Sequence, residues 1–135
     1  MNYLIDTNIC IYIMNQRPRE IIDKCRQFHP GDIAVSAITA SELQYGVAKS
    51  SSPAQNQARL DEFLLPFEIL PYNGDVAKAY GNIRACLEKQ GQPIGPLDFL
   101  IAAHALSRNL TLVTNNEKEF ARIQNLRVEN WLQTP

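Results

Sequence analysis

The sequence predicts a three-layer α/β/α fold in which helices cover both faces of a mostly parallel sheet. Two observations support this prediction: short apolar segments recur along the chain, and longer segments with helical periodicity separate them. Strands that alternate with helices in this way form βαβ units, which give a parallel sheet with both faces covered. The length of 135 residues fits one hydrophobic core, so we expect a single domain over residues 1–135.

Five short apolar segments bounded by polar or turn residues are predicted to be strands. In chain order they are Tyr3–Ile5, Ile33–Ser36, Glu68–Leu70, Thr111–Thr114 and, with the weakest pattern, Leu126–Val128. The segments between them have the apolar spacing that is typical of helices. These are Ile9–Met14, Pro18–Phe28, Ala40–Lys49, Ala54–Leu65, Asp75–Gln90, Leu97–Arg108 and Glu117–Arg122. The serines and the proline at 50–53 predict a turn between two helices and not a domain boundary.

The composition is that of a soluble globular protein. Hydrophobic residues make up 45% of the chain and charged residues 20%, and no apolar stretch is long enough to span a bilayer. The net charge of −1 argues against a protein that coats nucleic acid through bulk positive charge, although it leaves room for a local basic rim. Cys10, Cys25 and Cys86 are far apart, which argues against a disulfide framework or a zinc site. We therefore expect a cytoplasmic protein without a signal peptide.

Asp6 directly follows the first predicted strand, which places its carboxylate at the carboxyl edge of the sheet. In open α/β folds ligands bind at this edge. Asp6 is equally suited to cap the helix that follows, because Asp is a favoured N-cap residue. Glu42 follows the second predicted strand within two helical turns, but Thr39 and Glu42 also match a capping box. Each of these two acids therefore has both a functional and a purely structural interpretation.

Asp98 follows the loop 91–96, which contains two glycines and two prolines. In the first turn of the next predicted helix, the helix dipole favours a negative charge by about 0.3 to 1 kcal/mol. Helical periodicity places Asp98 on the same face as Ile101 and Ala102, which should pack against the sheet. Burying an unpaired carboxylate costs several times more than the dipole supplies, so we expect a partner or a metal ion there. Because this helix leads into the Thr111 strand from the opposite end, the loop before it must wrap to the side of the other acids.

A fourth polar cluster follows the strand predicted to end at Thr114. Asn115 or Asn116 is suited to cap a helical turn, and Glu119 to lie in solvent. If the strands are parallel, however, this cluster lies at the same sheet edge as Asp6. Two carboxylates about 4 Å apart repel by about 4 kcal/mol at an effective dielectric of about 20. A divalent cation would offset this repulsion, and oxygen ligands without His or Cys favour Mg²⁺ or Mn²⁺.

The polar clusters belong to four motifs that occur in order along the chain. These are Leu4–Asn8, Ser41–Leu43 with Gly46, Ile94–Asp98 leading into residues 101–105, and Leu112–Asn116 with Glu119–Phe120. Together they resemble the PIN-domain nucleases, and most closely the VapC toxins of bacterial toxin–antitoxin modules. The resemblance extends from about Tyr3 to Trp131.

The resemblance implies a Mg²⁺- or Mn²⁺-dependent endoribonuclease that hydrolyses structured RNA, with tRNA as the expected substrate. It implies that Asp6, Glu42 and Asp98 are catalytic acids and metal ligands. Many relatives carry Asp at the position of Asn116, and a related form carries an acid three residues further on. We therefore expect Glu119 to be the fourth catalytic acid and Asn116 to orient water or substrate. The resemblance also implies a small antitoxin partner and a homodimer.

Several polar residues are expected to support this site. Hydroxyl groups of Thr7 and Thr114 could fix the carboxylates or water through hydrogen bonds, and Asn8 and Asn116 complete the supporting set. Basic side chains must hold the RNA, and the candidates are Lys49, Arg84, Lys89 and Arg108. Tyr45 and Tyr72 could stack on bases, although packing accounts for them as well.

Two alternative functions remain open at this point. An aspartyl-phosphate hydrolase also uses an Asp after its first strand, but it requires a second Asp two positions later, where this chain has Asn8. The other alternative is a non-catalytic or degenerate PIN-like domain that binds RNA or protein, in which the acids serve only as helix caps.

Overall fold

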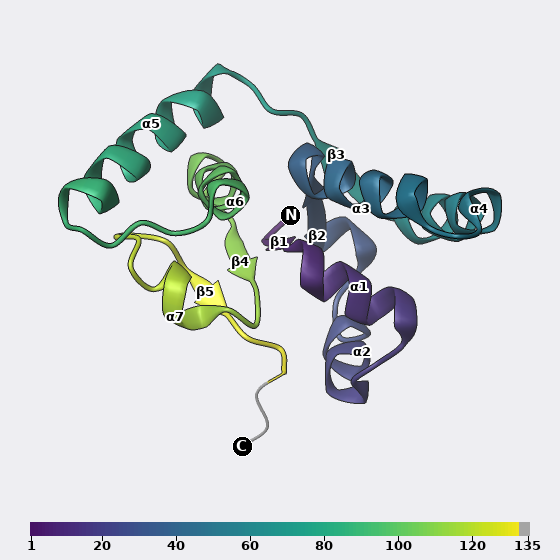
Figure 1. The fold of residues 1–135 in the computed structure, drawn as a ribbon. Coiled ribbons are helices and arrows are strands. Elements are labelled where there is room, and N and C mark those ends of the chain that lie inside the picture. The colour runs from purple at the N-terminus through teal and green to yellow at the C-terminus, as the bar shows by residue number, and fades with distance from the viewer. Residues whose placement is uncertain (133–135) are drawn as a thin grey trace.

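The computed structural model describes residues 1–132, which form a parallel sheet with helices on both faces (Figure 1). The strands are β1 (Tyr3–Ile5), β2 (Ile33–Ser36), β3 (Glu68–Leu70), β4 (Thr111–Val113) and β5 (Val128–Glu129). The helices are α1 (Thr7–Asn15), α2 (Arg19–Cys25), α3 (Ala37–Lys49), α4 (Pro53–Leu64), α5 (Gly74–Lys89), α6 (Pro96–Ser107) and α7 (Glu117–Phe120), and a short 3-10 helix, η1, spans Pro30–Asp32. The predicted fold class is confirmed.

The strand order β3-β2-β1-β4-β5 places β1 at the centre of the sheet. All four pairings are parallel, and Leu4 lies opposite Ala34 of β2 on one side and Leu112 of β4 on the other. From β1 the chain builds the sheet outward through β2 and β3, then returns to start the other half with β4. The order therefore reverses between β1 and β4, and in open α/β sheets ligands bind at the carboxyl ends of the strands at such a point.

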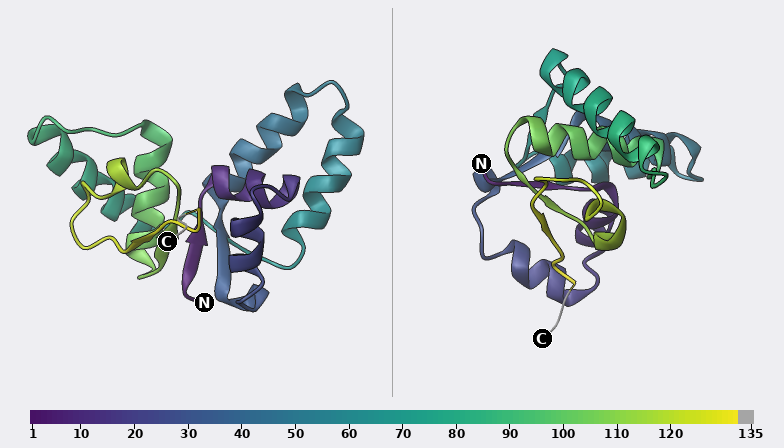
Figure 2. Two further views of the ribbon diagram at one scale, coloured as in Figure 1. Left: turned by 90° about the horizontal axis from the view of Figure 1, so that it is seen from below. Right: turned by 90° about the vertical axis from the view of Figure 1, so that its left-hand side faces the viewer.

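Successive residues of β1 point into two separate cores, because side chains alternate across a strand. Leu4 packs with residues of α5, α6 and α7 on one face of the sheet, whereas Ile5 packs with residues of α1, α2, α3 and α4 on the other. Figure 2 shows these two groups of helices on opposite sides of the strands. Every residue of β2 is buried, which explains why its sequence is almost continuously apolar.

Local capping chemistry accounts for the main differences between predicted and observed helix ends. The helix expected from Ala40 begins at Ala37, because the Ser36 hydroxyl accepts a hydrogen bond from the Ile38 amide at 3.1 Å and caps it. The predicted capping box of Thr39 and Glu42 is therefore wrong, since both residues lie inside the helix.

The fifth strand lies at Val128–Glu129 and not at 126–128. Within residues 1–132, no helix combines the length and apolar character that crossing a membrane requires.

The central strand should dominate the stability of the fold. Leu4 is 0% exposed, so Leu4→Ala leaves a cavity, and we expect it to lower the free energy of unfolding by about 2 to 5 kcal/mol in urea denaturation. Leu65 is 84% exposed, and the matched change Leu65→Ala should alter stability by no more than about 0.5 kcal/mol. Equal effects of the two substitutions would contradict this packing.

Candidate functional site

Asp6 lies at the point where the strand order reverses. It directly follows β1, and its backbone amide donates to the Val113 carbonyl at the end of β4, at 3.1 Å. The side chain is only 7% exposed. Its Oδ1 accepts from the Ile9 amide at 3.0 Å, so Asp6 does cap α1, and the Thr114 hydroxyl also bonds to it. Burial raises the pKa of Asp6, with a smaller contribution from the negative charge of Glu42.

Glu42 approaches from the second turn of α3 and is held by Thr7. The Thr7 hydroxyl donates to Glu42 Oε1 at 2.7 Å and lies 3.5 Å from the Thr39 hydroxyl. Glu42 thus bonds to the residue after Asp6 and not to the start of its own helix. Asn8 lies exposed in the first turn of α1.

Asp98 lies in the first turn of α6, which begins at the carboxyl edge of the sheet because this helix runs antiparallel to the strands. The loop 91–96 therefore brings Asp98 to the side of the other acids, as expected. Ile101 and Ala102 are buried as predicted, while Asp98 itself is half-buried. Burial, and then the charges of Glu119, Asp6 and Glu42, raise the pKa of Asp98 to about 6.

The fourth cluster contains both an acid and an amide. Asn116 Nδ2 donates to Glu119 Oε2 at 2.9 Å, and the Asn116 amide donates to the Thr114 hydroxyl at 3.0 Å. Asn116 occupies the N-cap position of α7 but its side chain forms no capping bond. Asn115 does not cap either, since its Nδ2 donates to the Tyr12 hydroxyl at 2.9 Å. The capping interpretation of these asparagines is therefore wrong.

The four acids come from four separate segments and share one electrostatic environment, since Glu119, Asp6 and Glu42 all act on Asp98. Among residues 1–132, however, no three acidic, His or Cys side chains converge closely enough to hold a metal ion as they stand. The donor set still fits a hard divalent cation, because it consists of oxygen atoms alone and its charges repel one another. A cation that neutralised this charge would allow the acids to approach one another.

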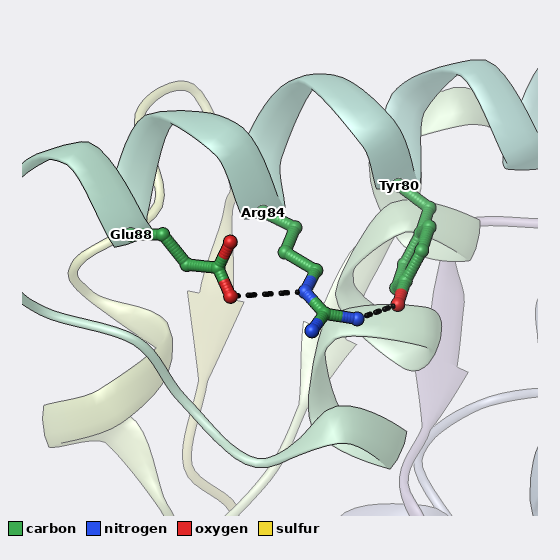
Figure 3. A network of polar contacts seen from close by, with 3 residues as sticks. All are labelled: Tyr80, Arg84 and Glu88. Atoms are coloured by element: carbon green, nitrogen blue, oxygen red, sulfur yellow. Dashed lines mark hydrogen bonds and ion pairs between the residues drawn. The ribbon is translucent and has the colours of Figure 1, made fainter.

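The basic candidates are distributed unequally around these acids. Lys49 ends α3, the helix that carries Glu42. Arg84 on α5 donates to both Glu88 and the Tyr80 hydroxyl, so its charge is already engaged (Figure 3). Arg108 lies at the opposite end of α6 from Asp98, about 15 Å away at 1.5 Å per residue, which is too far to contact the same phosphate.

Tyr12 and Thr39 support the site without having been assigned to it from the sequence. Tyr12 fixes Asn115 beside Thr114, and Thr39 is buried against Thr7. Both contacts join residues that are far apart in the chain, and in neither case does a local pattern predict them. His104 is buried, and its Nδ1 lies 2.7 Å from the Ser36 hydroxyl.

A sequence model of the PIN domain matches residues 3–126. The chain belongs to the PIN domain family. Ribonuclease VapC2 from Rickettsia felis is 47% identical over 132 residues, with 97% of this chain and 98% of the relative covered. The tRNA(fMet)-specific endonuclease VapC from Shigella flexneri is 40% identical over 131 residues, with 97% and 98% covered.

Solved structures show the same similarity. The crystal structure of VapBC2 from Rickettsia felis bound to a DNA fragment from their promoter matches this PIN domain with a TM-score of 0.90 and 46% identity, covering 97% of this chain and 99% of that one. DNA-bound VapBC from Salmonella typhimurium matches with a TM-score of 0.91 and 40% identity, covering 97% and 98%. The resemblance to PIN domains of the VapC type is thereby confirmed.

The raised pKa of Asp98 predicts a pH-dependent penalty on folding. In the unfolded chain this carboxyl ionises near its ordinary value of 3.8, whereas in the folded protein it ionises at about 6. Stability is therefore full below the unfolded pKa and falls as the pH rises through 6. Asp98→Asn removes this penalty, so in chelator at neutral pH it should stabilise the fold by on the order of 1 kcal/mol, an amount reduced by solvent screening.

Thermal unfolding across the pH range measures this effect. The gain of Asp98→Asn should vanish under acidic conditions, where wild-type Asp98 is protonated in both states. Asp23→Asn, on the exposed face of α2, provides the matched control and should show no comparable gain. A gain for Asp98→Asn that persisted unchanged in acid would contradict the assignment.

Proposed function

We propose that this PIN domain is a divalent-metal-dependent endoribonuclease. The observation that supports this most strongly is the gathering of Asp6, Glu42, Asp98 and Glu119 from four segments at the reversal of strand order, with the pKa of Asp98 raised to about 6. If these acids served only as helix caps, their role would not require them to lie within electrostatic range of one another. The names of the relatives as ribonucleases support RNA as the substrate.

In this proposal Asp6, Asp98 and Glu42 hold Mg²⁺ or Mn²⁺, and Glu119 supplies the fourth catalytic acid. The metal, when bound, lowers the pKa of a water molecule and stabilises charge on the phosphate. The chain's own residues orient the acids for this role. Thr7 holds the Glu42 carboxylate, Thr114 bonds to Asp6, and Asn116 holds Glu119, while Asn8 lies exposed on α1.

The expected substrate is a structured RNA such as a tRNA, as the name of the Shigella flexneri relative suggests. An antitoxin is the expected protein partner, since the similar structures are VapBC complexes. A homodimer and a cytoplasmic location complete the proposal. The non-catalytic domain and the aspartyl-phosphate hydrolase are the alternatives that the following experiments exclude or support.

Asp6→Asn should abolish RNA cleavage without harming the fold. Asn is as good an N-cap as Asp, so the bond from the Ile9 amide is kept, while a buried charge with a raised pKa is removed. We expect cleavage of tRNA in Mg²⁺ to fall by about 100-fold or more, and thermal stability to be unchanged or slightly higher. Retained activity in a preparation free of wild-type protein would rule out this mechanism, and Asp23→Asn serves as the active control.

Metal binding is testable without any cleavage assay, because a cation that binds only the folded state raises its melting temperature. Mg²⁺ or Mn²⁺ should stabilise the wild type, and Asp98→Asn should lose most of this effect. Asn116→Asp replaces an amide that donates to Glu119 with a second negative charge. We expect this variant to be less stable than wild type in chelator and to gain more stability from the metal. Absence of any metal effect on the wild type would favour a non-catalytic domain.

A further inference from the structure

The face of α3 that carries Glu42 continues into an exposed aromatic residue and a lysine. Tyr45 and Lys49 follow Glu42 at spacings of three and seven residues, so all three project from one side of the helix. The Tyr45 side chain is 66% exposed, and Lys49 Nζ lies 4.9 Å from the centre of its ring. At 1.5 Å per residue, Lys49 stands about 10 Å along the helix from Glu42.

Two other cation–aromatic pairs occur within residues 1–132, and both are already engaged. Phe28, which lies under Lys24 Nζ, is stacked on Trp131 with a centroid distance of 5.5 Å. Arg84, over the Tyr80 ring, bonds to Glu88 at 3.1 Å (Figure 3).

Lys49, in contrast, has no acidic partner in the part of the chain that the structure describes. Of these three pairs, only that of Tyr45 and Lys49 presents a freely accessible ring beside an unneutralised cation. It also stands on the same helix as a residue of the acid cluster. Stacking on another ring or pairing with an acid within the fold therefore does not explain why Tyr45 and Lys49 lie together.

Gly46 adds an independent observation on the same helix. A glycine within a helix costs roughly 1 kcal/mol relative to alanine. A Cβ at position 46 would meet no atom within 4 Å, so packing in the described chain does not require a glycine here. Gly46 and Glu42 both line a hollow of about 240 Å³. The open backbone at Gly46 thus lies beside Glu42, and a glycine backbone is what close approach of a ligand would use.

We propose that Tyr45 and Lys49 form a nucleotide-binding subsite next to the acids. Tyr45 stacks on an unpaired RNA base, and Lys49 contacts the phosphate beside it. This inference rests on the proposed ribonuclease function. It answers an electrostatic difficulty of that function, because four carboxylates repel RNA and the chain has a net charge of −1. Aromatic stacking is the sequence-tolerant way to hold single-stranded RNA, and it pairs with cations that follow the backbone.

Binding of a fluorescein-labelled short single-stranded RNA, measured by anisotropy in the full chain carrying Asp6→Asn, tests the subsite apart from cleavage. Tyr45→Ala should weaken binding about tenfold, whereas Tyr45→Phe should keep it, since stacking needs the ring and not the hydroxyl. Lys49→Gln should weaken binding and reduce the slope of log K against log salt by about one. Lys78→Gln, which removes the same charge from an exposed position of α5, is the matched control and should have a smaller effect.

An RNA in which one base is replaced by an abasic position, moved stepwise along the strand, supplies the second readout. The protein that keeps Tyr45 should bind one RNA of this series less tightly than the others, namely the one whose abasic position falls at Tyr45. The Tyr45→Ala variant should bind all RNAs of the series equally. Equal binding by Tyr45→Ala and Tyr45→Phe would overturn the proposal. The proposal would also be overturned if Tyr45→Ala converted a dimer to a monomer in sedimentation and left the affinity for RNA unchanged. That result would assign this face of α3 to contact with a second copy of the chain. Failure of the wild type to cleave any RNA would contradict the proposed function, while the binding result still decides the subsite.

Discussion

The parallel pairing of β1 with β2 on one side and β4 on the other determines where every candidate functional residue lies. Because both neighbours run in the same direction as β1, the segments after β1, β2 and β4 all emerge at one edge. The helix that leads into β4 must start at that same edge, which brings Asp98 there as well. No single local interaction gathers the acids. Their meeting follows from strand direction and strand order, and these depend in turn on the apolar residues that bury each face of the sheet.

The same arrangement places a destabilising element inside a stable frame. Burial raises the pKa of both Asp6 and Asp98, and the charges of the other acids add to this effect, so the charged form of each weakens the fold. The hydrogen bonds from Thr7 and Asn116 orient Glu42 and Glu119 without cancelling any charge, since both donors are neutral. A site of this kind is stable only because two extensive apolar cores hold its supports in place. This is the usual conflict between stability and a preorganised charged site.

Much of this arrangement could be predicted from local sequence. Short apolar runs identified the strands, and the position of Asp6 directly after a strand placed it at the carboxyl edge of the sheet, where the strand order reverses. Prediction failed where a residue's partner is distant in the chain. Thr39 and Glu42 match a capping box, but Ser36 caps the helix and Glu42 bonds to Thr7, 35 positions earlier. At the fourth corner Glu119 is the acid and Asn116 is the amide that donates to it, a pairing that the capping interpretation of Asn116 did not predict.

The double use of Asp6, as helix cap and as candidate ligand, has a genetic consequence. Asparagine fills the cap equally well, and an aspartate codon becomes an asparagine codon by one base change. A cell burdened by a harmful activity of this chain can therefore escape it through a single mutation that leaves a folded protein, one that proteases have no reason to remove. Counting intact open reading frames or soluble protein would overestimate the number of active copies in a population, and the base at the first position of codon 6 would be the informative marker.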